Sequence, residues 1–180
     1  MEELALSDIT KGLPGVSTIE GTNLFENCIV ALHKCNHPSP VTLSVDGMTR
    51  HDYTLNWDDN YNDQLARTYA DEQSMTERAA IAISILLALK QTSYTVIERS
   101  RKGTGFDYML GEKDDPFFNP KARLEISGIL RESPQNSVNS RYQQKEKQTS
   151  ISDDMQLPAY ISIVEFNTPK ALFNIKIKTK

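Results

Sequence analysis

The sequence predicts an α/β fold in which a mixed central sheet is flanked by helices. Two observations lead to this prediction. Short apolar runs with strand character alternate with longer stretches of helical periodicity, and residues typical of turns separate the two kinds. The chain has 180 residues, of which 38% are hydrophobic and 24% charged, so it is long enough to bury a single core.

The first part of the chain, 1–60, is expected to be an N-terminal elaboration. Residues 1–21 contain glycine and proline without any hydrophobic period, which indicates a loose arm. From Thr22 onward the apolar side chains return every three or four residues, so a helix is expected there, with Thr22 or Asn23 as its N-cap. Alternating apolar residues over 40–57 then predict an antiparallel β-hairpin.

The second part, 61–180, is expected to form the main α/β unit. A helical stretch over 61–91, in one or two pieces, has an apolar second half that predicts a buried helix. Ser74 and Glu77 fit a capping box at the start of that half. Three strands are expected to follow, and two more lie near the C-terminus; the strands are "SYTVIERS", "GFDYML", "ARLEISGIL", "AYISIVEF" and "ALFNIKIKTK". Between the two groups, the polar composition of 131–157 is compatible with disorder, and the helix formers over 138–149 are compatible with a polar helix.

Two of these strand-like runs each carry one acidic residue near the middle. They are Asp107 in "GTGFDYMLG" and Glu125 in "ARLEISG". A carboxylate within an apolar strand is unfavourable unless it is paired, hydrogen-bonded or bound to a metal ion. Carboxylates on adjacent strands can converge on one Mg²⁺ ion. The alternative is a pair of structural acids, each answering an arginine such as Arg99, Arg101 or Arg123.

The order of elements from the buried helix onward resembles the core of the PD-(D/E)XK nuclease-like superfamily. That restriction-endonuclease-like core has a helix, three strands, a second helix and a fourth strand. The resemblance implies that Asp107 and Glu125 are catalytic residues and ligands of Mg²⁺, the only cofactor it suggests. The family's third strand reads Glu-x-Lys, and Ser127 stands here in place of the lysine. Lys145 from the second helix, or alternatively Lys102 before the second strand, would replace it, and Glu77 from the first helix would assist.

Cationic residues near the two acids are the expected contacts to nucleic acid. Arg101 and Lys102 precede the second strand of the core, and Arg141 lies on a helical stripe with Lys145 and Gln148. Such residues can bind phosphates. A stripe of this kind is also typical of the solvated face of a helix, so both interpretations stay open.

Three segments, "TVIERSRKGTGFDYMLG", "ARLEISGIL" and "VEFNTPKA", are similar to sequences of small proteins encoded in bacterial anti-phage defence gene clusters. Those proteins accompany larger ATPases. This resemblance implies an accessory subunit with a degenerate nuclease-like fold that binds a partner ATPase and can bind DNA. The missing lysine favours that interpretation. The alternative is an active Mg²⁺-dependent DNA endonuclease that uses Asp107, Glu125 and the relocated lysine.

Composition excludes some classes of function. The net charge of −4 argues against a uniformly basic surface, although it allows local basic patches. No apolar run approaches the roughly 18 residues of a membrane span, and the N-terminus lacks the form of a secretory signal. The two cysteines are too few for a disulfide framework. A cytoplasmic protein without membrane contact is therefore expected.

Overall fold

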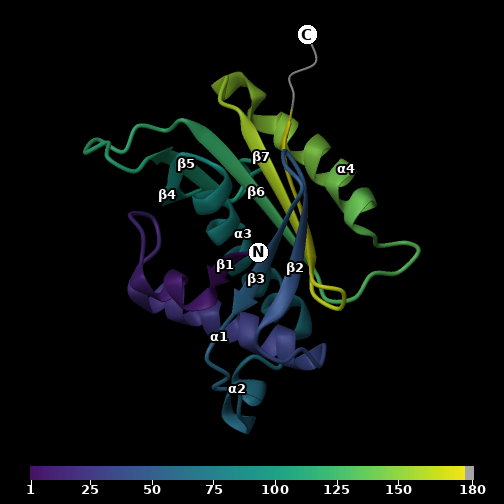
Figure 1. Cartoon of the computed structure of the whole chain (residues 1–180). Helices are drawn as coiled ribbons and strands as arrows, with labels where there is room; N and C mark the ends of the chain where they lie inside the picture. Colours follow the sequence, from purple (N-terminus) through teal and green to yellow (C-terminus); the bar gives the residue numbers. More distant parts are fainter. Residues whose placement is uncertain (177–180) are drawn as a thin grey trace.

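The computed structural model describes residues 1–176, in which eight strands form one mixed sheet with helices on both faces (Figure 1). The α/β class with a mixed sheet is therefore confirmed. Across the sheet the strands are ordered β1-β3-β2-β8-β7-β6-β5-β4. The strands are β1 (Glu2–Ala5), β2 (Val41–Gly47), β3 (His51–Asn56), β4 (Tyr94–Arg99), β5 (Tyr108–Glu112), β6 (Ala122–Ile129), β7 (Ala159–Glu165) and β8 (Lys170–Lys176). The helices are α1 (Thr18–Lys34), α2 (Asp63–Thr68), α3 (Glu72–Gln91) and α4 (Val138–Thr149), with 3-10 helices η1 (Leu6–Lys11) and η2 (Ser150–Met155).

The part of the sheet that carries the acidic residues is formed by β4, β5, β6 and β7. The first three strands are antiparallel neighbours, whereas β7 pairs with β6 in parallel. A parallel pair requires a crossover connection, and α4 provides it between β6 and β7. This connection places α4 directly over the strand that contains Glu125.

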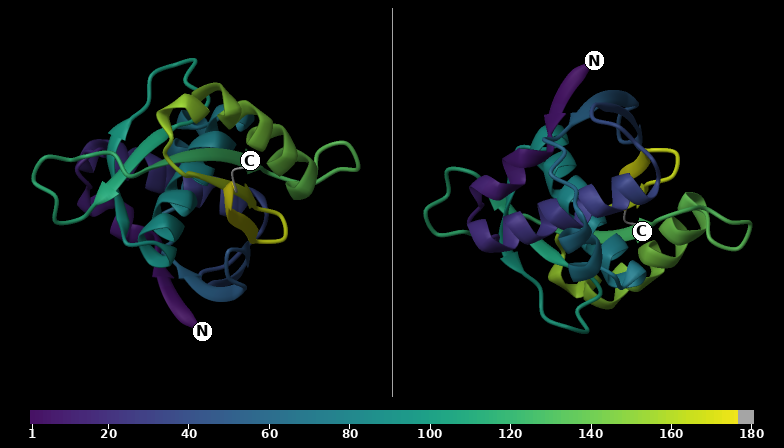
Figure 2. Two further views of the ribbon diagram at one scale, coloured as in Figure 1. Left: turned by 90° about the horizontal axis from the view of Figure 1, so that it is seen from above. Right: turned by 90° about the horizontal axis from the view of Figure 1, so that it is seen from below.

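Helices lie on both faces of the sheet (Figure 2), and two separate apolar clusters hold these layers together. The larger cluster lies between the sheet and the helices α1 and α3, and the smaller one lies beneath α4. Strand β7 is buried along its whole length and alternates between them: Ile161 and Ile163 belong to the α4 side. On the other side the hydroxyl of Ser162 lies 2.7 Å from the hydroxyl of Ser84 in α3. The apolar run of α3 is thus buried, as the sequence predicts.

The expectation of a loose arm over 1–21 is wrong. Strand β1 pairs in parallel with β3, η1 follows it, and the side chain of Leu6 is fully buried in the larger core. Helix α1 begins at Thr18, and the hydroxyl of Ser17 caps it, so neither Thr22 nor Asn23 is the N-cap. The partner of β1 lies about fifty residues away in the chain, and a local hydrophobic period cannot reveal such a contact.

The start of α3 also differs from the prediction. Its N-cap is Asp71, whose carboxylate accepts a hydrogen bond of 2.7 Å from the backbone N–H of Ser74. The capping box expected at Ser74 and Glu77 is therefore not formed. Glu77 instead lies one turn inside the helix, where its side chain is exposed and accepts a hydrogen bond from Gln73.

The predicted hairpin over 40–57 is confirmed as the antiparallel pair β2 and β3, and the polar helix over 138–149 is confirmed as α4. Strand β2 also pairs in parallel with β8, so the elements of 1–60 and 61–180 share one sheet. The boundary at residue 60 stays a prediction. Among the helices of the described chain, none has the length and apolarity needed to cross a membrane.

Candidate functional site

The two predicted acids meet where strands β5 and β6 part. The last residues paired between these strands are Tyr108 and Leu124. Asp107 comes just before Tyr108, and its backbone N–H donates to the carbonyl of Leu124 at 2.9 Å. Within residues 1–176, no strand pairs with this edge of β6 beyond Leu124, so the edge is open from Glu125 to Ile129. The separation of β5 and β6 leaves space beside Asp107 and Glu125.

Asp107 makes one of the hydrogen bonds that a neighbouring strand would otherwise make with the open edge of β6. Its carboxylate accepts a hydrogen bond of 2.8 Å from the backbone N–H of Ile126, which would otherwise lack a partner on the open edge. Burial raises the pKa of Asp107, although this hydrogen bond and the charge of Lys145 act in the opposite direction. Asp107 thus has a structural role at the point where β5 and β6 separate, and its negative charge acts on the neighbouring carboxyl group of Glu125.

Glu125 is buried, with only 1% of its side chain exposed. Its Oε1 accepts a hydrogen bond from the ammonium of Lys145 at 2.6 Å and another from the amide of Gln148 at 3.0 Å. Its Oε2 is buried and has no hydrogen-bond partner among the described residues. Burial and the nearby charge of Asp107 raise the pKa of Glu125 to about 7, against the opposing effect of Lys145.

The polar stripe of α4 faces the sheet. Arg141 donates to the hydroxyl of Ser127 at 3.0 Å and to the side-chain oxygen of Asn136 at 2.7 Å. One turn further along the helix, Lys145 and Gln148 contact Glu125. The solvated-face interpretation of this stripe is therefore wrong. Because Ser127 and Glu125 lie on the same face of β6, α4 covers both of them.

Three pockets line the open edge of β6. The loop pocket has a volume of about 600 Å³, the central pocket about 390 Å³ and the outer pocket about 500 Å³. The loop pocket is lined by Arg99, Arg101, Lys102, Asp107, Glu125 and Gln148, among others. The central pocket is lined by Glu77, Arg99, Asp107, Ser127, Arg141 and Lys145, among others. The outer pocket is lined by Glu72, Glu77, Gly128, Arg131, Asn136 and Arg141, among others.

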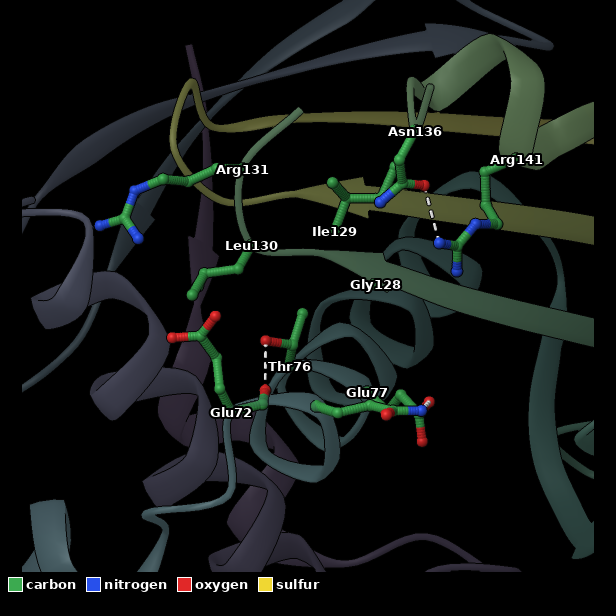
Figure 3. Close-up of a pocket in the computed structure, with 10 residues that line it drawn as sticks. Glu72, Thr76, Glu77, Gly128, Ile129, Leu130, Arg131, Asn136 and Arg141 are labelled. Atoms are coloured by element: carbon green, nitrogen blue, oxygen red, sulfur yellow. Dashed lines mark hydrogen bonds between the residues drawn. The ribbon is translucent and has the colours of Figure 1, made fainter. Parts of the chain in front are cut away.

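The residues predicted to contact nucleic acid all line these pockets. Arg101 and Lys102 are exposed in the loop before β5, beside the acid pair. Arg141 and Glu77 approach the outer pocket from opposite helices, α4 and α3, as Figure 3 shows. Glu77 shares the central pocket with Asp107, and its side chain is hydrogen-bonded to Gln73 rather than to the acid pair.

The outer pocket contains two residues that sequence patterns do not indicate, Arg131 and Asn136 (Figure 3). Both lie in the irregular segment between β6 and α4, where no hydrophobic period relates a residue to its neighbours in space. Arg131 also donates to the carbonyl of Lys34 at 2.6 Å, which fixes its orientation. Asn136 lies just before the N-cap Ser137 of α4, so its side chain reaches Arg141 five residues further along the chain.

The alternative in which each acid pairs with an arginine fails for Glu125, because its partner is Lys145. Arg123, two residues earlier on β6, donates instead to the segment that follows α4. Its guanidinium contacts the carbonyl oxygens of Thr149 and Leu157 and the side chains of Ser152 and Asp153.

The site offers two carboxylates to a metal ion. No group of three or more His, Cys, Asp or Glu side chains suited to a metal occurs in the part of the chain described, residues 1–176. Mg²⁺ needs fewer protein ligands than this, because it keeps several waters and is commonly held by one or two carboxylates together with substrate phosphate. The unpartnered Oε2 of Glu125 and the adjacent Asp107 fit that requirement.

Comparison with family models, curated proteins and solved structures finds no match to this chain. A function must therefore be inferred from the arrangement of the site.

Proposed function

We propose that this protein is a Mg²⁺-dependent DNA nuclease in which Lys145 replaces the lysine missing at Ser127. One observation carries the proposal: the ammonium of Lys145 lies 2.6 Å from Oε1 of Glu125, beside Asp107. A buried acid pair with one cation and one unpartnered oxygen is a costly arrangement for stability alone. Groups with shifted pKa values in a pocket are typical of functional sites.

The order of elements supports the same proposal. A helix, three antiparallel strands, a second helix and a strand parallel to the third follow one another from α3 to β7. The acids belong to the second and third of these strands, at the point where the strands separate. This is the arrangement expected from the resemblance to the PD-(D/E)XK nuclease-like core. Only the lysine comes from a different element than in that family: in this proposal Lys145 of α4 takes the role of a lysine on the third strand.

Asp107 and Glu125 would hold the ion. When bound, Mg²⁺ supplies positive charge to the phosphate and lowers the pKa of a coordinated water. Lys145 would neutralise charge that develops on the phosphate oxygens as the water oxygen bonds to phosphorus and the bond to the leaving oxygen breaks. Gln148 orients Lys145, since its side-chain oxygen accepts from that ammonium at 3.3 Å while its amide donates to Glu125.

The experiment is a cleavage assay with purified protein, DNA and Mg²⁺ or Mn²⁺. Wild-type protein is expected to cut DNA, and chelation of the metal is expected to abolish cutting. Asp107→Asn and Glu125→Gln should each lose activity, whereas Glu98→Gln, which changes an exposed residue of β4, should retain it. Cutting that survives either site substitution would contradict the assignment of the acids. Absence of cutting under all conditions would contradict the catalytic proposal.

A second candidate function is an accessory subunit of an anti-phage defence complex that binds a larger ATPase and can bind DNA. The turn between β5 and β6 favours it. Phe117 and Phe118 are 83% and 50% exposed there, and the carboxylate of Asp115 fixes the turn by accepting from the backbone N–H groups of Phe117 and Asn119. Exposed aromatic side chains on an ordered turn are suited to anchor a partner protein.

This second function is tested by co-expression with the product of a neighbouring ATPase gene. Wild-type protein should co-purify with that product, and Phe117→Ser with Phe118→Ser should abolish the complex without changing the fold. A complex that tolerates both substitutions would exclude the turn as the anchor. The two functions are compatible, because the turn lies at the opposite end of β5 from Asp107.

A further inference from the structure

The three pockets beside the acid pair adjoin one another, and we refer to this row of pockets as the groove. The loop pocket and the central pocket share Arg99 and Asp107. The central pocket and the outer pocket share Glu77 and Arg141. The groove therefore follows the open edge of β6 from the loop before β5 to the first turns of α3. The acid pair lies at the junction of the loop and central pockets, not at one end of the groove.

Cationic side chains line the groove on both sides of the acid pair, although the chain as a whole is acidic. Arg101 and Lys102 lie in the loop pocket, and Arg141 and Arg131 lie towards the other end, where Glu72 and Glu77 also line the outer pocket. This distribution suits a polyanion that extends in both directions from the acids, because each cation can meet a different phosphate. A small anionic ligand would need cations at one point only.

The acid pair is recessed below the surface. Glu125 is 1% exposed, and Lys145, which lies over it, is 19% exposed. The loop before β5 packs closely on α4, because a Cβ added to Gly105 would lie 2.5 Å from the carbonyl oxygen of Gln148. Helix α3 forms the other wall of the central pocket. A bond to be cut must therefore enter a confined space to reach the acids.

We infer that the groove binds a single DNA strand and excludes intact duplex, an inference that rests on the proposed nuclease function. Duplex DNA is stiff over about 50 nm, so one of its phosphates cannot bend alone into a recess. A single strand is flexible, and grooves that bind it combine cations along the backbone path with confined sites for individual nucleotides.

The test is a binding measurement with Glu125→Gln, which keeps the size of the side chain and prevents cutting. Fluorescence anisotropy in the presence of Ca²⁺ compares a labelled single strand with the same sequence in a blunt-ended duplex. The single strand is expected to bind at least tenfold more tightly. Equal or tighter binding of the duplex would overturn the inference and leave the nuclease proposal standing. Failure to bind either DNA would overturn both.

Substitutions at the two ends of the groove test whether the strand follows it. Arg101→Ala with Lys102→Ala, and separately Arg131→Ala, should each weaken single-strand binding several-fold. Each should also reduce the salt dependence of binding, by about 0.7 in the slope of log K against log salt for each phosphate that the variant no longer neutralises. Lys11→Ala is the matched control, since Lys11 is paired with Asp8 on the surface and does not line the groove. An effect no larger than that of the control at either end would overturn the proposed path.

Discussion

Arg123 and Glu125 lie two residues apart on the same face of β6, and each is 1% exposed, yet their surroundings differ. Arg123 makes five hydrogen bonds, which reach the end of α4, η2 and the residues that follow. Glu125 has partners for one carboxylate oxygen only, and its Oε2 has none among the described residues. Burial is equal at the two positions, whereas hydrogen-bond satisfaction is not.

Burial of a charge therefore does not by itself mark a functional residue. A buried charge whose hydrogen bonds are all made fixes the structure around it. A buried charge with an unused oxygen retains the capacity to bind something else, and its pKa is shifted because solvation is not fully replaced. In this protein Arg123, whose hydrogen bonds are all made, holds the end of α4 in place. Glu125, which has an unused oxygen, lies beneath the same helix.

The largest expected effect is on stability and concerns Arg123. Arg123→Met should lower the free energy of unfolding by about 3–5 kcal/mol, because the substitution leaves buried acceptors of η2 and the α4 end without a donor. Denaturant unfolding monitored by circular dichroism measures the change. Arg50→Met, at a residue with 88% side-chain exposure, is the control and should have little effect. A loss below about 1 kcal/mol for Arg123→Met would remove the contrast with Glu125.

Next in size is the effect of Lys145 on activity. Lys145→Met should reduce the rate of DNA cleavage by about 100-fold or more, as expected when a charge-stabilising group is removed. Single-turnover cleavage with saturating protein measures this rate. Lys147→Met changes an exposed lysine of the same helix and should leave the rate unchanged. Equal rates for the two variants would show that Lys145 is only a structural partner of Glu125.

The pH dependence of stability tests the buried carboxyl of Glu125 directly. The pKa of Glu125 is raised to about 7, so between about pH 4.5 and 7 the folded protein binds a proton that the unfolded chain has lost. This contribution is present at low pH and disappears as the pH rises. Glu125→Gln lacks the group, so its stability relative to wild type should increase from pH 5 to pH 8, on the order of 2 kcal/mol.

Unfolding curves of both proteins at the two pH values provide that measurement. Glu98→Gln, at an exposed position of β4, is the matched control and should track wild type. A constant difference between Glu125→Gln and wild type across this range would mean that Glu125 is ionised throughout, like an ordinary paired carboxylate.

The smallest expected effect is a rescue. Ser127→Lys in the Lys145→Met background restores a lysine two residues after Glu125, on the same face of β6. The new side chain would extend into the central pocket, which Ser127 lines. Cleavage should recover about tenfold over Lys145→Met alone, which corresponds to an activation free energy lower by about 1.4 kcal/mol. Ser127→Leu in the same background is the control, and recovery with both residues would point to packing rather than charge.

Much of the core follows from local patterns. The hairpin over 40–57, the buried helix α3 and the polar helix α4 are recognisable because each has its own period or its own turn residues. Asp107 and Glu125 stand out for a similar reason, as acids within apolar runs. The N-terminal arm is not recognisable, because β1 and η1 depend on contacts with β3 and the core.

By itself the sequence determined that two acids lie in consecutive strands and that a serine, Ser127, stands two residues after Glu125. It also determined that Arg141, Lys145 and Gln148 share one side of a helix, because helical spacing relates them. Which way that side faces was decided only by the tertiary structure. The parallel pairing of β6 with β7 requires α4 to cross over the sheet, and this crossing brings Lys145 to within 2.6 Å of Glu125.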